Sequence, residues 1–564
     1  MTTPAPGAPR ASPGWAPPVD DEADADAEAS RIIRLFARET NLLVAGRPVR
    51  VIGADAVAKS ARALARALGA QMVPAQPSVL PGVEATTEPA AWQESLLEID
   101  VTSLPGRMSL GGSPLPSRST AASRIDFAGV HMPITRALAT ELATDKTVAG
   151  LRIGVCLTLE PKTAQLALHL TGAGADVCVY AHPDETDSEV ATELRARGIH
   201  VVADAAASGD GERAAAIGFI RRGLDVLVDD GSHLVRLAHQ EAPQEVRRWI
   251  GVSEETTSGL TLLRAMSAQG VLGTAVIAVN DAATKTGFDN RYGTGQSCVF
   301  AIVDLLEESG VDVRDQPALV IGYGPVGQGV AAHFAALGAE VRVSETNPVR
   351  ALLAQHDGYR VGRAADLGAG ALVVSATGVA GTVDVDLMRS AFAVAVAGGV
   401  PGEIDLDQAL EGDSLEPVSR AVERLAGAGT LVLDRGGCIN ITAAEGNPIE
   451  IMDLSFATQL AAIRELVTTR PSVGVHAMTD AAVAHVGAVA ARERGVNLDR
   501  GVELDRGVQT DPEAQTGAVE LDSPSPKAAD AAAAFPAADG WHSPRFKDAG
   551  PNIGRSSSPT QETS

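Results

Sequence analysis

Three glycines with the spacing GxGxxG stand in the segment ALVIGYGPVGQG. An apolar run precedes them and the helix-forming stretch VAAHFAALG follows, so the loop joins a predicted strand to a predicted helix. In that context Gly322 permits a tight turn, Gly324 lets a phosphate approach the backbone, and Gly327 lets the helix pack on the strand. The helix N-terminus would face the anion. The pattern predicts a dinucleotide cradle made by Gly322, Gly324, Pro325, Val326 and Gly327.

One acidic residue indicates which dinucleotide the cradle would hold. Glu345 lies 23 residues after Gly322, at the end of the predicted strand EVRVSE. A carboxylate there accepts hydrogen bonds from the ribose hydroxyls and repels a 2′-phosphate. The sequence therefore favours NAD over NADP. A Rossmann unit with an empty site is the alternative that the motif alone leaves open.

Alternating strand and helix patterns must position this loop. Four earlier strand-like runs are LRIGVCLTL (151–159), ADVCVYA (175–181), HVVAD (200–204) and LDVLVDD (224–230). Helical stretches separate them, which predicts a parallel sheet with crossover helices. The glycine loop opens a second such unit, which is expected to run to about residue 440.

A third strand–turn–helix–strand pattern, VRVIGADAVAKSARALARALGAQMV, lies near the N-terminus. Gly53 aligns with the first glycine of the cradle, but Asp55 and Ala58 replace the second and third. Without those glycines a backbone cannot approach a pyrophosphate. We therefore predict a βα unit that binds no dinucleotide. An ordinary Ala-rich strand–helix unit would show the same pattern.

Composition excludes several classes of function. The 564 residues are 45% hydrophobic and carry a formal net charge of −25, which disfavours nucleic acid and anionic membrane surfaces as partners. The four cysteines form no CxxC pair, so we expect no disulfide framework and no metal site. We see no signal peptide and no uncharged apolar run long enough to span a membrane, and we expect a cytoplasmic protein.

Two further motifs are more specific than the glycine loop: GVSEETTSGL (251–260) and AVIAVNDAATKTGFDNRYGTGQS (275–297). With EGNPIEIMDLSFATQ (445–459) and VGVH (473–476), the chain resembles the S-adenosylhomocysteine hydrolase family from about Met132 to about residue 495. The resemblance implies a tightly held NAD that oxidises the ribose 3′-hydroxyl of a nucleoside. The ketone acidifies the 4′-hydrogen, the 5′-substituent is eliminated, water adds, and the ketone is reduced again. It also implies a homo-oligomer.

The fold class expected from these patterns is α/β, with two doubly wound domains, an extra N-terminal βα module and disordered tails. The two domains are a substrate domain and an inserted Rossmann NAD-binding domain. The predicted boundaries are 1–29 for a disordered tail, 30–120 for the N-terminal module with a linker over 76–120, 121–292 for the substrate-binding domain, 293–444 for the Rossmann domain, 445–497 for the C-terminal part of the substrate domain and 498–564 for a disordered tail.

Matching motif to motif assigns roles to single residues. Glu255 matches the glutamate that binds the ribose hydroxyls, and Lys285 and Asp289 match the pair at the 2′- and 3′-oxygens. Asp230 matches an aspartate that handles protons near C4′ and C5′. These four are the predicted catalytic residues. The predicted substrate-binding residues are Thr158, Glu160, Thr163, Asn290 and Asn447. The cofactor-binding set adds Thr256, Thr257, Ser258, Asn280, Thr377 and Asn440 to Glu345 and the glycine loop.

The chain departs from the family pattern at three histidines. Thr158, Gly399 and Asn447 stand where the family has imidazoles. These side chains do not titrate near neutral pH, and losing one acid–base group typically lowers a rate by about 10²–10⁴-fold. His131 and His233 are new candidates, although each is also compatible with a plain structural role. The Lys and Tyr ending of the family is missing too, which puts the usual tetramer and the tight hold on NAD in doubt.

The redox half of the family's site is retained and the half around C5′ and the base is altered. We therefore expect an enzyme that oxidises an adenine-type nucleoside transiently at C3′, eliminates across C4′–C5′ as a lyase or dehydratase, and reduces the ketone again. Epimerisation through the same C4′ carbanion is another route. A true S-adenosylhomocysteine hydrolase and a non-catalytic regulatory homologue that binds NAD or a nucleoside are the alternatives.

Overall fold

The computed structural model describes residues 22–74, 90–102, 106–314, 316–400 and 402–499. These residues divide into two compact units. Unit 1 contains residues 22–119 and 289–451, and unit 2 contains residues 120–288 and 452–499. Unit 2 is therefore built from two separate stretches of chain.

Unit 2 contains a seven-stranded parallel sheet in the order β20-β11-β10-β9-β6-β7-β8. Strand order reverses between β6 and β9, which are neighbours although β7 and β8 come between them in the chain. Ligands of doubly wound proteins bind beyond the carboxyl ends of the strands at such a point. The strands are β6 (Arg152–Cys156), β7 (Asp176–Tyr180), β8 (His200–Val202), β9 (Val226–Asp229), β10 (Gly251–Glu254), β11 (Ala275–Ala278) and β20 (Gly474–Ala477).

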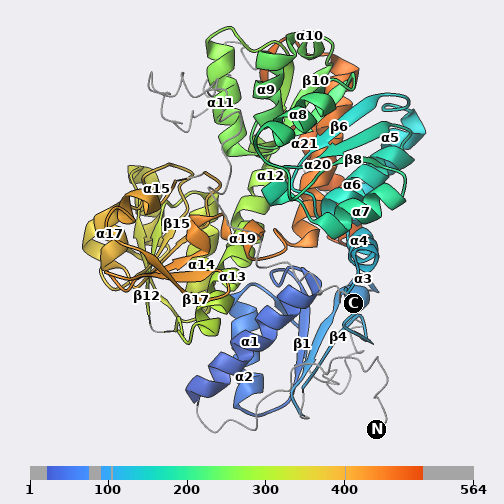
Figure 1. The fold of residues 1–564 in the computed structure, drawn as a ribbon. Coiled ribbons are helices and arrows are strands. Elements are labelled where there is room, and N and C mark those ends of the chain that lie inside the picture. The colour runs from blue at the N-terminus through green and yellow to red at the C-terminus, as the bar shows by residue number, and fades with distance from the viewer. Residues whose placement is uncertain (1–21, 75–89, 103–105, 315, 401, 500–564) are drawn as a thin grey trace, which may run out of the picture. The chain divides into compact units, whose positions relative to one another are not determined.

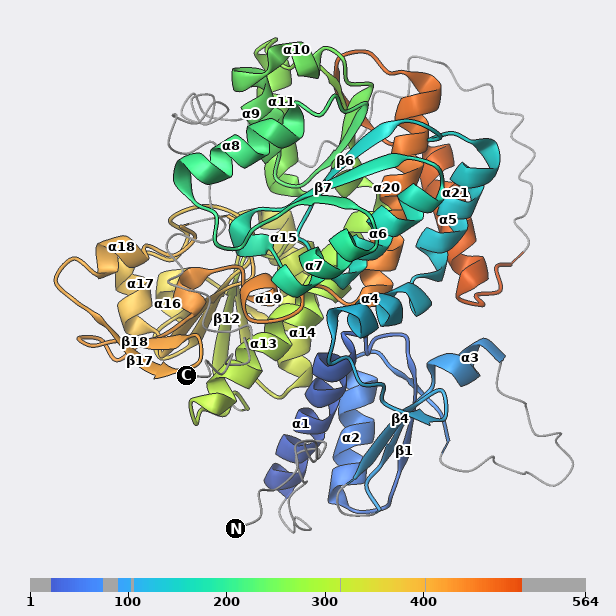
Figure 2. The ribbon, with the colours of Figure 1, turned by 45° about the vertical axis from the view of Figure 1, so that its right-hand side comes forward.

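Helices cover both faces of this sheet, as Figures 1 and 2 show. The helices α8, α9 and α11 supply the apolar side chains of one buried core, and α6 and α7 lie over the opposite face. All strand residues of β9, β10 and β11 are buried, as expected for a sheet enclosed on two sides. The bounds are α6 (Pro161–Gly172), α7 (Ser188–Ala196), α8 (Gly209–Ile220), α9 (His233–Glu241) and α11 (Thr257–Ala268).

Unit 1 contains the Rossmann sheet, in the order β14-β13-β12-β15-β16-β19-β18-β17. The first six strands are parallel, and β18 and β17 are antiparallel additions. The order reverses between β12 and β15, where the glycine loop follows β12. The strands are β12 (Pro317–Ile321), β13 (Glu340–Ser344), β14 (Arg360–Val361), β15 (Leu372–Ser375), β16 (Ala393–Val396), β17 (Leu415–Ser419), β18 (Val422–Leu425) and β19 (Leu431–Leu433). The predicted α/β class with two doubly wound sheets is confirmed.

The N-terminal module, residues 22–119, is the other part of unit 1. Its sheet has the order β2-β1-β3-β4-β5, with β1 parallel to β2 and β3 and the last pairs antiparallel. The predicted βα unit is present as β1, α2 and β2. The elements are α1 (Glu22–Thr40), β1 (Pro48–Ile52), α2 (Ala56–Ala67), β2 (Gln71–Met72), α3 (Ala90–Ser95), β3 (Leu97–Asp100), β4 (Arg107–Leu110) and β5 (Ser113–Pro114).

Two boundary predictions were wrong here. The stretch 76–120, expected to be a linker, contains the strands β3, β4 and β5 among its described residues. Its frequent Pro and Gly residues obscured strands only two to four residues long. Helix α1 begins at Glu22, inside the predicted disordered tail 1–29, because its acidic start leads into an apolar face with Ile32, Ile33 and Phe36 buried. The remaining predicted disorder, 1–21 and 500–564, lies outside the described residues.

Three further observations concern membrane spans, disulfides and metal sites. No helix in the described ranges is long and apolar enough to cross a membrane. The cysteines Cys156, Cys178, Cys298 and Cys438 are buried and free of disulfides. Within the part of the chain that the structure describes, no group of three or more His, Cys, Asp or Glu side chains could hold a metal ion.

Candidate active site

The glycine loop follows β12 and leads into α14 (Pro325–Ala336), as predicted. Gly322 has a φ of +93°, and a Cβ there would lie 2.9 Å from the carbonyl oxygen of Ala376. A Cβ at Gly327 would lie 1.9 Å from the carbonyl oxygen of Gly322, so only glycine fits. At Gly324 the nearest described atom would be an Arg350 nitrogen at 3.8 Å. The loop is closed on its protein side and open at Gly324, and this shape fits a pyrophosphate at the N-terminus of α14.

Glu345 follows β13 directly, beside the glycine loop. Its carboxylate accepts backbone hydrogen bonds from Tyr323 (2.7 Å), Thr346 (2.7 Å) and Asn347 (2.8 Å). Partial burial would raise the pKa of this carboxyl, but the three N–H donors outweigh it and the pKa of Glu345 lies below its usual value. The group is therefore anionic at neutral pH and oriented, as a ribose-binding carboxylate must be.

Two other predicted cofactor residues lie in unit 1. Thr377 follows β15, the strand next to β12, and its hydroxyl lies 2.7 Å from that of Thr382 and 3.3 Å from the Glu403 carboxylate. Asn440 is the second residue of the short helix α19 (Ile439–Thr442). Its amide donates to the side-chain oxygen of Asn447 at 3.0 Å. At Gly399, where the family has a histidine, a Cβ would meet no described atom within 4 Å. That position has room but no acid or base.

The predicted residues Asp289, Asn290 and Asn447 are also in unit 1. The Asn447 amide donates to Asp289 Oδ1 at 2.5 Å and to the hydroxyl of Thr294 at 3.2 Å. Its oxygen accepts from Ser297 at 2.9 Å, which fixes the orientation of the amide. Asp289 is buried and Asn290 is half-buried beside it in the π-helical turn η3 (Asp289–Gly293). Asn447 therefore holds the predicted catalytic carboxylate, and sequence reasoning did not foresee this contact.

The other predicted catalytic pair lies in unit 2. Glu255 follows β10, and Lys285 lies on the short helix α12 (Ala283–Thr286). The Lys285 ammonium is 3.9 Å from Glu255 Oε1 and donates to Asn280 at 3.3 Å. Both side chains are buried, with 4% and 7% of their surface exposed. The lysine and the carboxylate thus form a buried ion pair, and the lysine is also hydrogen-bonded to Asn280.

Sequence reasoning missed the residues that orient Glu255. Ser455 and Gln459 donate to its two carboxylate oxygens from α20 (Ile449–Thr469), where they lie four residues apart on one face. Both belong to the quoted motif EGNPIEIMDLSFATQ, so the helical spacing of its polar residues could have revealed them. With both oxygens held, Glu255 has a fixed orientation.

The last predicted cofactor residues, Thr256, Thr257, Ser258 and Asn280, also fall in unit 2. Thr256 caps α11 by accepting from the Gly259 backbone, and Ser258 donates to Thr256 at 3.4 Å. Asn280 donates to Thr257 at 2.9 Å while accepting from Lys285. Asn280 therefore links the predicted cofactor residues of this unit to the predicted catalytic lysine.

Asp230 follows β9 in a loop that adjoins two buried carboxylates, Asp229 at the end of β9 and Glu254 at the end of β10. Burial raises the pKa of Asp229 to about 7, and burial next to Asp229 raises the pKa of Glu254 far above its usual range. Glu254 accepts from the backbone of Gly231 (2.8 Å) and Ser232 (3.0 Å), which holds the loop. Asp230 is half-buried at the edge of this cluster. An acid at this position lies at the reversal point of the sheet.

Two buried histidines adjoin this loop, and only His233 was considered from the sequence. His233 Nδ1 lies 3.1 Å from His182 Nε2, and His182 Nδ1 lies 3.4 Å from Glu212. Burial alone would lower the pKa of His182, but the hydrogen bond with Glu212 and the charge of Glu185 outweigh it and raise the pKa. The three side chains form a Glu–His–His chain that can pass a proton. His131, the other new candidate, packs on Phe127 at the end of α4 (Ala121–Val130).

The end of β6 carries the predicted substrate residues Thr158, Glu160 and Thr163. Thr163 donates to the Thr158 carbonyl at 2.7 Å, and Glu160 forms an ion pair with Lys162 at 2.7 Å. Lys162 is fully buried and was not predicted. Glu160 stands at the N-cap position of α6 without a side-chain capping hydrogen bond, so the start of this helix places an ammonium and a carboxylate at the reversal point of the sheet.

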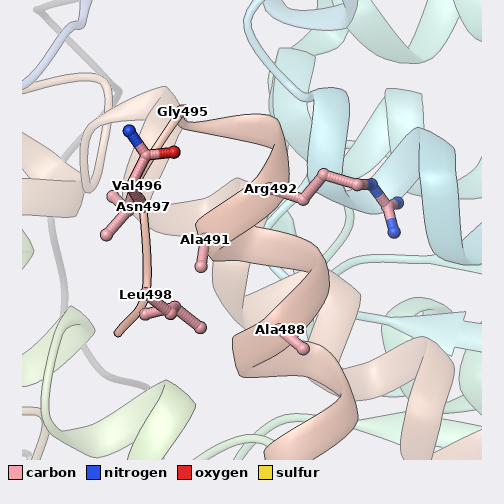
Figure 3. A pocket seen from close by; sticks show the side chains of 7 residues that line it. All are labelled: Ala488, Ala491, Arg492, Gly495, Val496, Asn497 and Leu498. Carbon is pink, nitrogen blue, oxygen red and sulfur yellow. The ribbon is translucent and has the colours of Figure 1, made fainter. Parts of the chain in front are cut away.

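A shallow hollow lies elsewhere in unit 2, between α21 (Asp480–Glu493) and residues 495–498. Figure 3 shows small and apolar side chains around it, such as Ala488 and Leu498, and Arg492 pointing away. No predicted site residue lines it, so we assign it no role.

These features define an NAD-binding Rossmann protein whose second α/β unit carries a buried lysine–glutamate pair. The NAD-binding domain of S-adenosyl-L-homocysteine hydrolase matches residues 290–446. The chain is 33% identical over 391 residues to an adenosylhomocysteinase of Nostoc sp., covering 67% of this chain and 91% of the relative. It is 36% identical over 355 residues to an S-inosyl-L-homocysteine hydrolase of Methanopyrus kandleri, covering 61% and 82%. The chain belongs to the S-adenosylhomocysteine hydrolase family as a divergent member, and its cofactor is NAD.

Proposed function

We propose that this protein oxidises a purine nucleoside thioether or nucleoside transiently at C3′, eliminates the 5′-substituent and reduces the ketone again. The observation that carries the proposal is the buried Lys285–Glu255 pair, with Glu255 held by Ser455 and Gln459. Bound NAD would supply an acceptor for the C3′ hydrogen with its electron pair and later return both. A merely structural site would have little reason to bury an ammonium in this way.

The site residues are proposed to have separate roles in the oxidation step. Glu255 would accept hydrogen bonds from the ribose hydroxyls, and Lys285 would take the 3′-hydroxyl proton as the ketone forms. Asp289, held by Asn447, is assigned by its own motif to the ribose oxygens. These roles rest on the matched motifs and on the buried, hydrogen-bonded state of each group.

The protons of the later steps need another acid or base, because Thr158, Gly399 and Asn447 cannot supply one. We assign them to Asp230 with His233, whose partners His182 and Glu212 form a buried chain behind it. An acid–base group of this kind typically contributes about 10²–10⁴ in rate. We propose that no water is added after the elimination, as in a lyase or dehydratase, because the family's own imidazoles for these steps are absent, and that the ketone is then reduced.

A second candidate function is favoured by Lys162. Some relatives are named for S-inosyl-L-homocysteine and others for S-adenosylhomocysteine, which differ in the group at purine C6. A buried ammonium donates hydrogen bonds only, so it would suit a 6-oxo group better than a 6-amino group. If Glu160 and Thr163 contact the base, hydrolysis of S-inosyl-L-homocysteine is the alternative reaction.

One experiment separates these functions. The purified protein with NAD is incubated with S-adenosylhomocysteine, S-inosylhomocysteine, adenosine or inosine, while nicotinamide absorbance and product masses are followed. Transient reduction with an unsaturated nucleoside product supports the proposal. Fast release of homocysteine and an intact nucleoside from either thioether would establish a true hydrolase instead. Absence of any reduction would favour a non-catalytic homologue. Assembly into a homo-oligomer is part of the proposal and is tested by light scattering.

A further inference from the structure

The N-terminal module is the part of the chain that the proposed reaction does not use, yet it contacts a segment that carries a site residue. Residues 445–450 contain Asn447. Asn41, at the end of α1, donates from its side chain to the Glu445 carbonyl at 3.0 Å and accepts from the Ile449 backbone at 2.9 Å. Asn41 has a φ of +52°, a left-handed conformation that asparagine tolerates better than most residues. One residue of the module thus brackets the segment from both sides.

Two ion pairs hold the ends of the same segment. Glu450 binds Arg47 through one carboxylate oxygen and accepts from the Leu43 backbone at 3.0 Å through the other. Arg118 binds Glu445 at 2.6 Å. The side chains of Arg47 and Arg118 are only 4% and 6% exposed, so solvent screens these contacts less than it screens surface pairs.

The module also contacts the helix that faces Asn447. Gln296, on α13 (Thr294–Glu308), accepts from the Val44 backbone at 2.9 Å and donates to the Leu42 carbonyl at 3.0 Å. Its neighbour Ser297 donates to Asn447. Residues 41–44 of the module therefore pair with both structures that surround the Asn447 side chain.

Residues 445–448 lie between α19 and α20 and form no regular element, whereas residues 449 and 450 begin α20. Gly446 adopts a φ of +71° and Pro448 has no N–H to donate, so a regular ladder cannot form through residues 445–448. The Gly446 backbone donates to the Asn440 carbonyl at 2.8 Å. The side-chain contacts of Glu445 and Glu450 described above come from the module. Residues 445–448 therefore take their position from their neighbours, among them the module, α13 and the start of α20.

We propose that the N-terminal module is a positioning element of the active site: by gripping residues 445–450 it fixes Asn447, which holds the Asp289 carboxylate. The catalytic half of this inference rests on the proposed function of Asp289. The module would not be a second nucleotide site, because the Asp55 carboxylate already accepts from the Ala58 backbone at the N-terminus of α2, where a phosphate would sit. Neither Asn41 nor the two arginines touches the reacting atoms in this proposal, so their effect is transmitted through Asn447.

The test uses the full-length protein with NAD and compares Arg118→Gln, Glu445→Gln and the charge-swapped pair Arg118→Glu with Glu445→Arg. The matched control is Arg50→Gln, which removes an ion pair with Glu98 inside the module and does not touch residues 445–450. Hydrogen exchange of the peptide over 441–451 measures how firmly the module holds residues 445–450. The rate of nicotinamide reduction on adding nucleoside measures whether Asp289 still functions. Thermal unfolding and NAD affinity are measured for each variant. If Arg118→Gln fails to fold, Arg118→Lys replaces it.

We expect the single variants to exchange about tenfold faster over 441–451, which corresponds to one lost charged hydrogen bond. They should reduce nicotinamide about tenfold more slowly with NAD affinity unchanged, and the charge-swapped pair should restore both. Unchanged exchange overturns the inference. Faster exchange with an unchanged rate of reduction also overturns it, because the grip would then not reach Asp289. If wild-type protein reduces no nicotinamide with any nucleoside, the proposed function has failed, and the exchange of the variants alone decides whether the module grips the segment.

Discussion

Unit 1 contains two strand–turn–helix units with almost the same backbone and opposite electrostatics. The residue that caps α2 is Asp55, with φ −71° and ψ −177°, and the residue that caps α14 is Gly324, with φ −71° and ψ −174°. Asp55 turns its carboxylate onto the helix and accepts from the Ala58 backbone at 2.8 Å. Gly324 has no side chain, so the first N–H groups of α14 are left for a ligand. The two strand–turn–helix units therefore differ in that α2 is capped by a carboxylate of the chain, whereas α14 has no side-chain cap and would be capped by a bound phosphate.

The largest expected effect comes from a substitution at Gly327, where the helix α14 packs closely on the Gly322 carbonyl. In Gly327→Ala the new methyl would overlap the Gly322 carbonyl, so the loop must deform. We expect the free energy of unfolding to fall by about 1–3 kcal/mol or more and bound NAD to be lost. Thermal unfolding and the NAD content of desalted protein measure this. The matched control, Ala58→Gly in the N-terminal module, should cost about 1 kcal/mol and leave NAD in place. A Gly327→Ala protein that retains NAD would show that the loop is less tightly packed than described.

The next variant gives the glycine loop before α14 the capping aspartate that the loop before α2 has. Gly324→Asp suits the existing backbone, because Asp55 already occupies the same conformation. The new carboxylate should cap α14 and stabilise the fold by up to about 1 kcal/mol. It should also repel the pyrophosphate and weaken NAD binding on the order of 100-fold, as expected for like charges a few ångströms apart.

Calorimetric titration with NAD and thermal unfolding measure the two effects of Gly324→Asp. Gly324→Asn is the control, since it caps the helix without the charge and should weaken NAD binding less. Equal loss in both variants would mean that bulk, and not charge, excludes the phosphate.

A smaller effect is expected at the residue that selects the dinucleotide. Glu345→Gln removes the charge that three backbone donors stabilise. We expect the preference for NAD over NADP to fall about tenfold, since hydrogen bonds to charged groups contribute more than neutral ones. Titration with both dinucleotides measures it. Glu340→Gln, an exposed position on the same strand, should leave the preference unchanged. An unaltered ratio in Glu345→Gln would assign selectivity to other residues.

The smallest expected effect on stability and NAD binding is at Asp55, in the strand–turn–helix unit of the N-terminal module. Asp55→Ala removes the cap of α2 and should lower the free energy of unfolding by about 1 kcal/mol, with Asp55→Asn nearly neutral. NAD affinity should not change in either variant. Chemical denaturation and NAD titration check this pair. A change in NAD affinity would contradict this prediction, because it would show that the cap of α2 affects the glycine loop before α14.

Local patterns predicted the parts of the site that are local. The glycine loop and Glu345 lie within one strand–helix–strand unit, so spacing alone placed them together. The matched motifs named Lys285, Glu255 and Asp289, but not what holds them. Ser455 and Gln459 reach Glu255 from a helix 200 residues away in sequence, so the motif could show them as two polar residues on one helix face but not name Glu255 as their partner. His182 was missed for the same reason, because its partners Glu212 and His233 come from the helices α8 and α9.

The strands of the N-terminal module show a different limit. β4 and β5 are four and two residues long and follow several prolines and glycines. Strands that short carry too little alternation to be distinguished from a loop, and their pairing with β3 supplies the order. The role of Asn41 was equally invisible, because a lone asparagine at the end of a helix reads as an ordinary stop signal.

The pairing of β20 with β11 has a consequence for how the chain emerges from the ribosome. The two strands are parallel neighbours, yet the whole Rossmann sheet is translated between them. At roughly 5–20 residues per second, β11 waits on the order of ten seconds or more for its partner, with its hydrogen-bonding edge exposed. The Rossmann sheet, whose strands are contiguous in sequence, can mature during that interval. Synthesis should therefore complete the cofactor-binding sheet before the sheet of unit 2 can close.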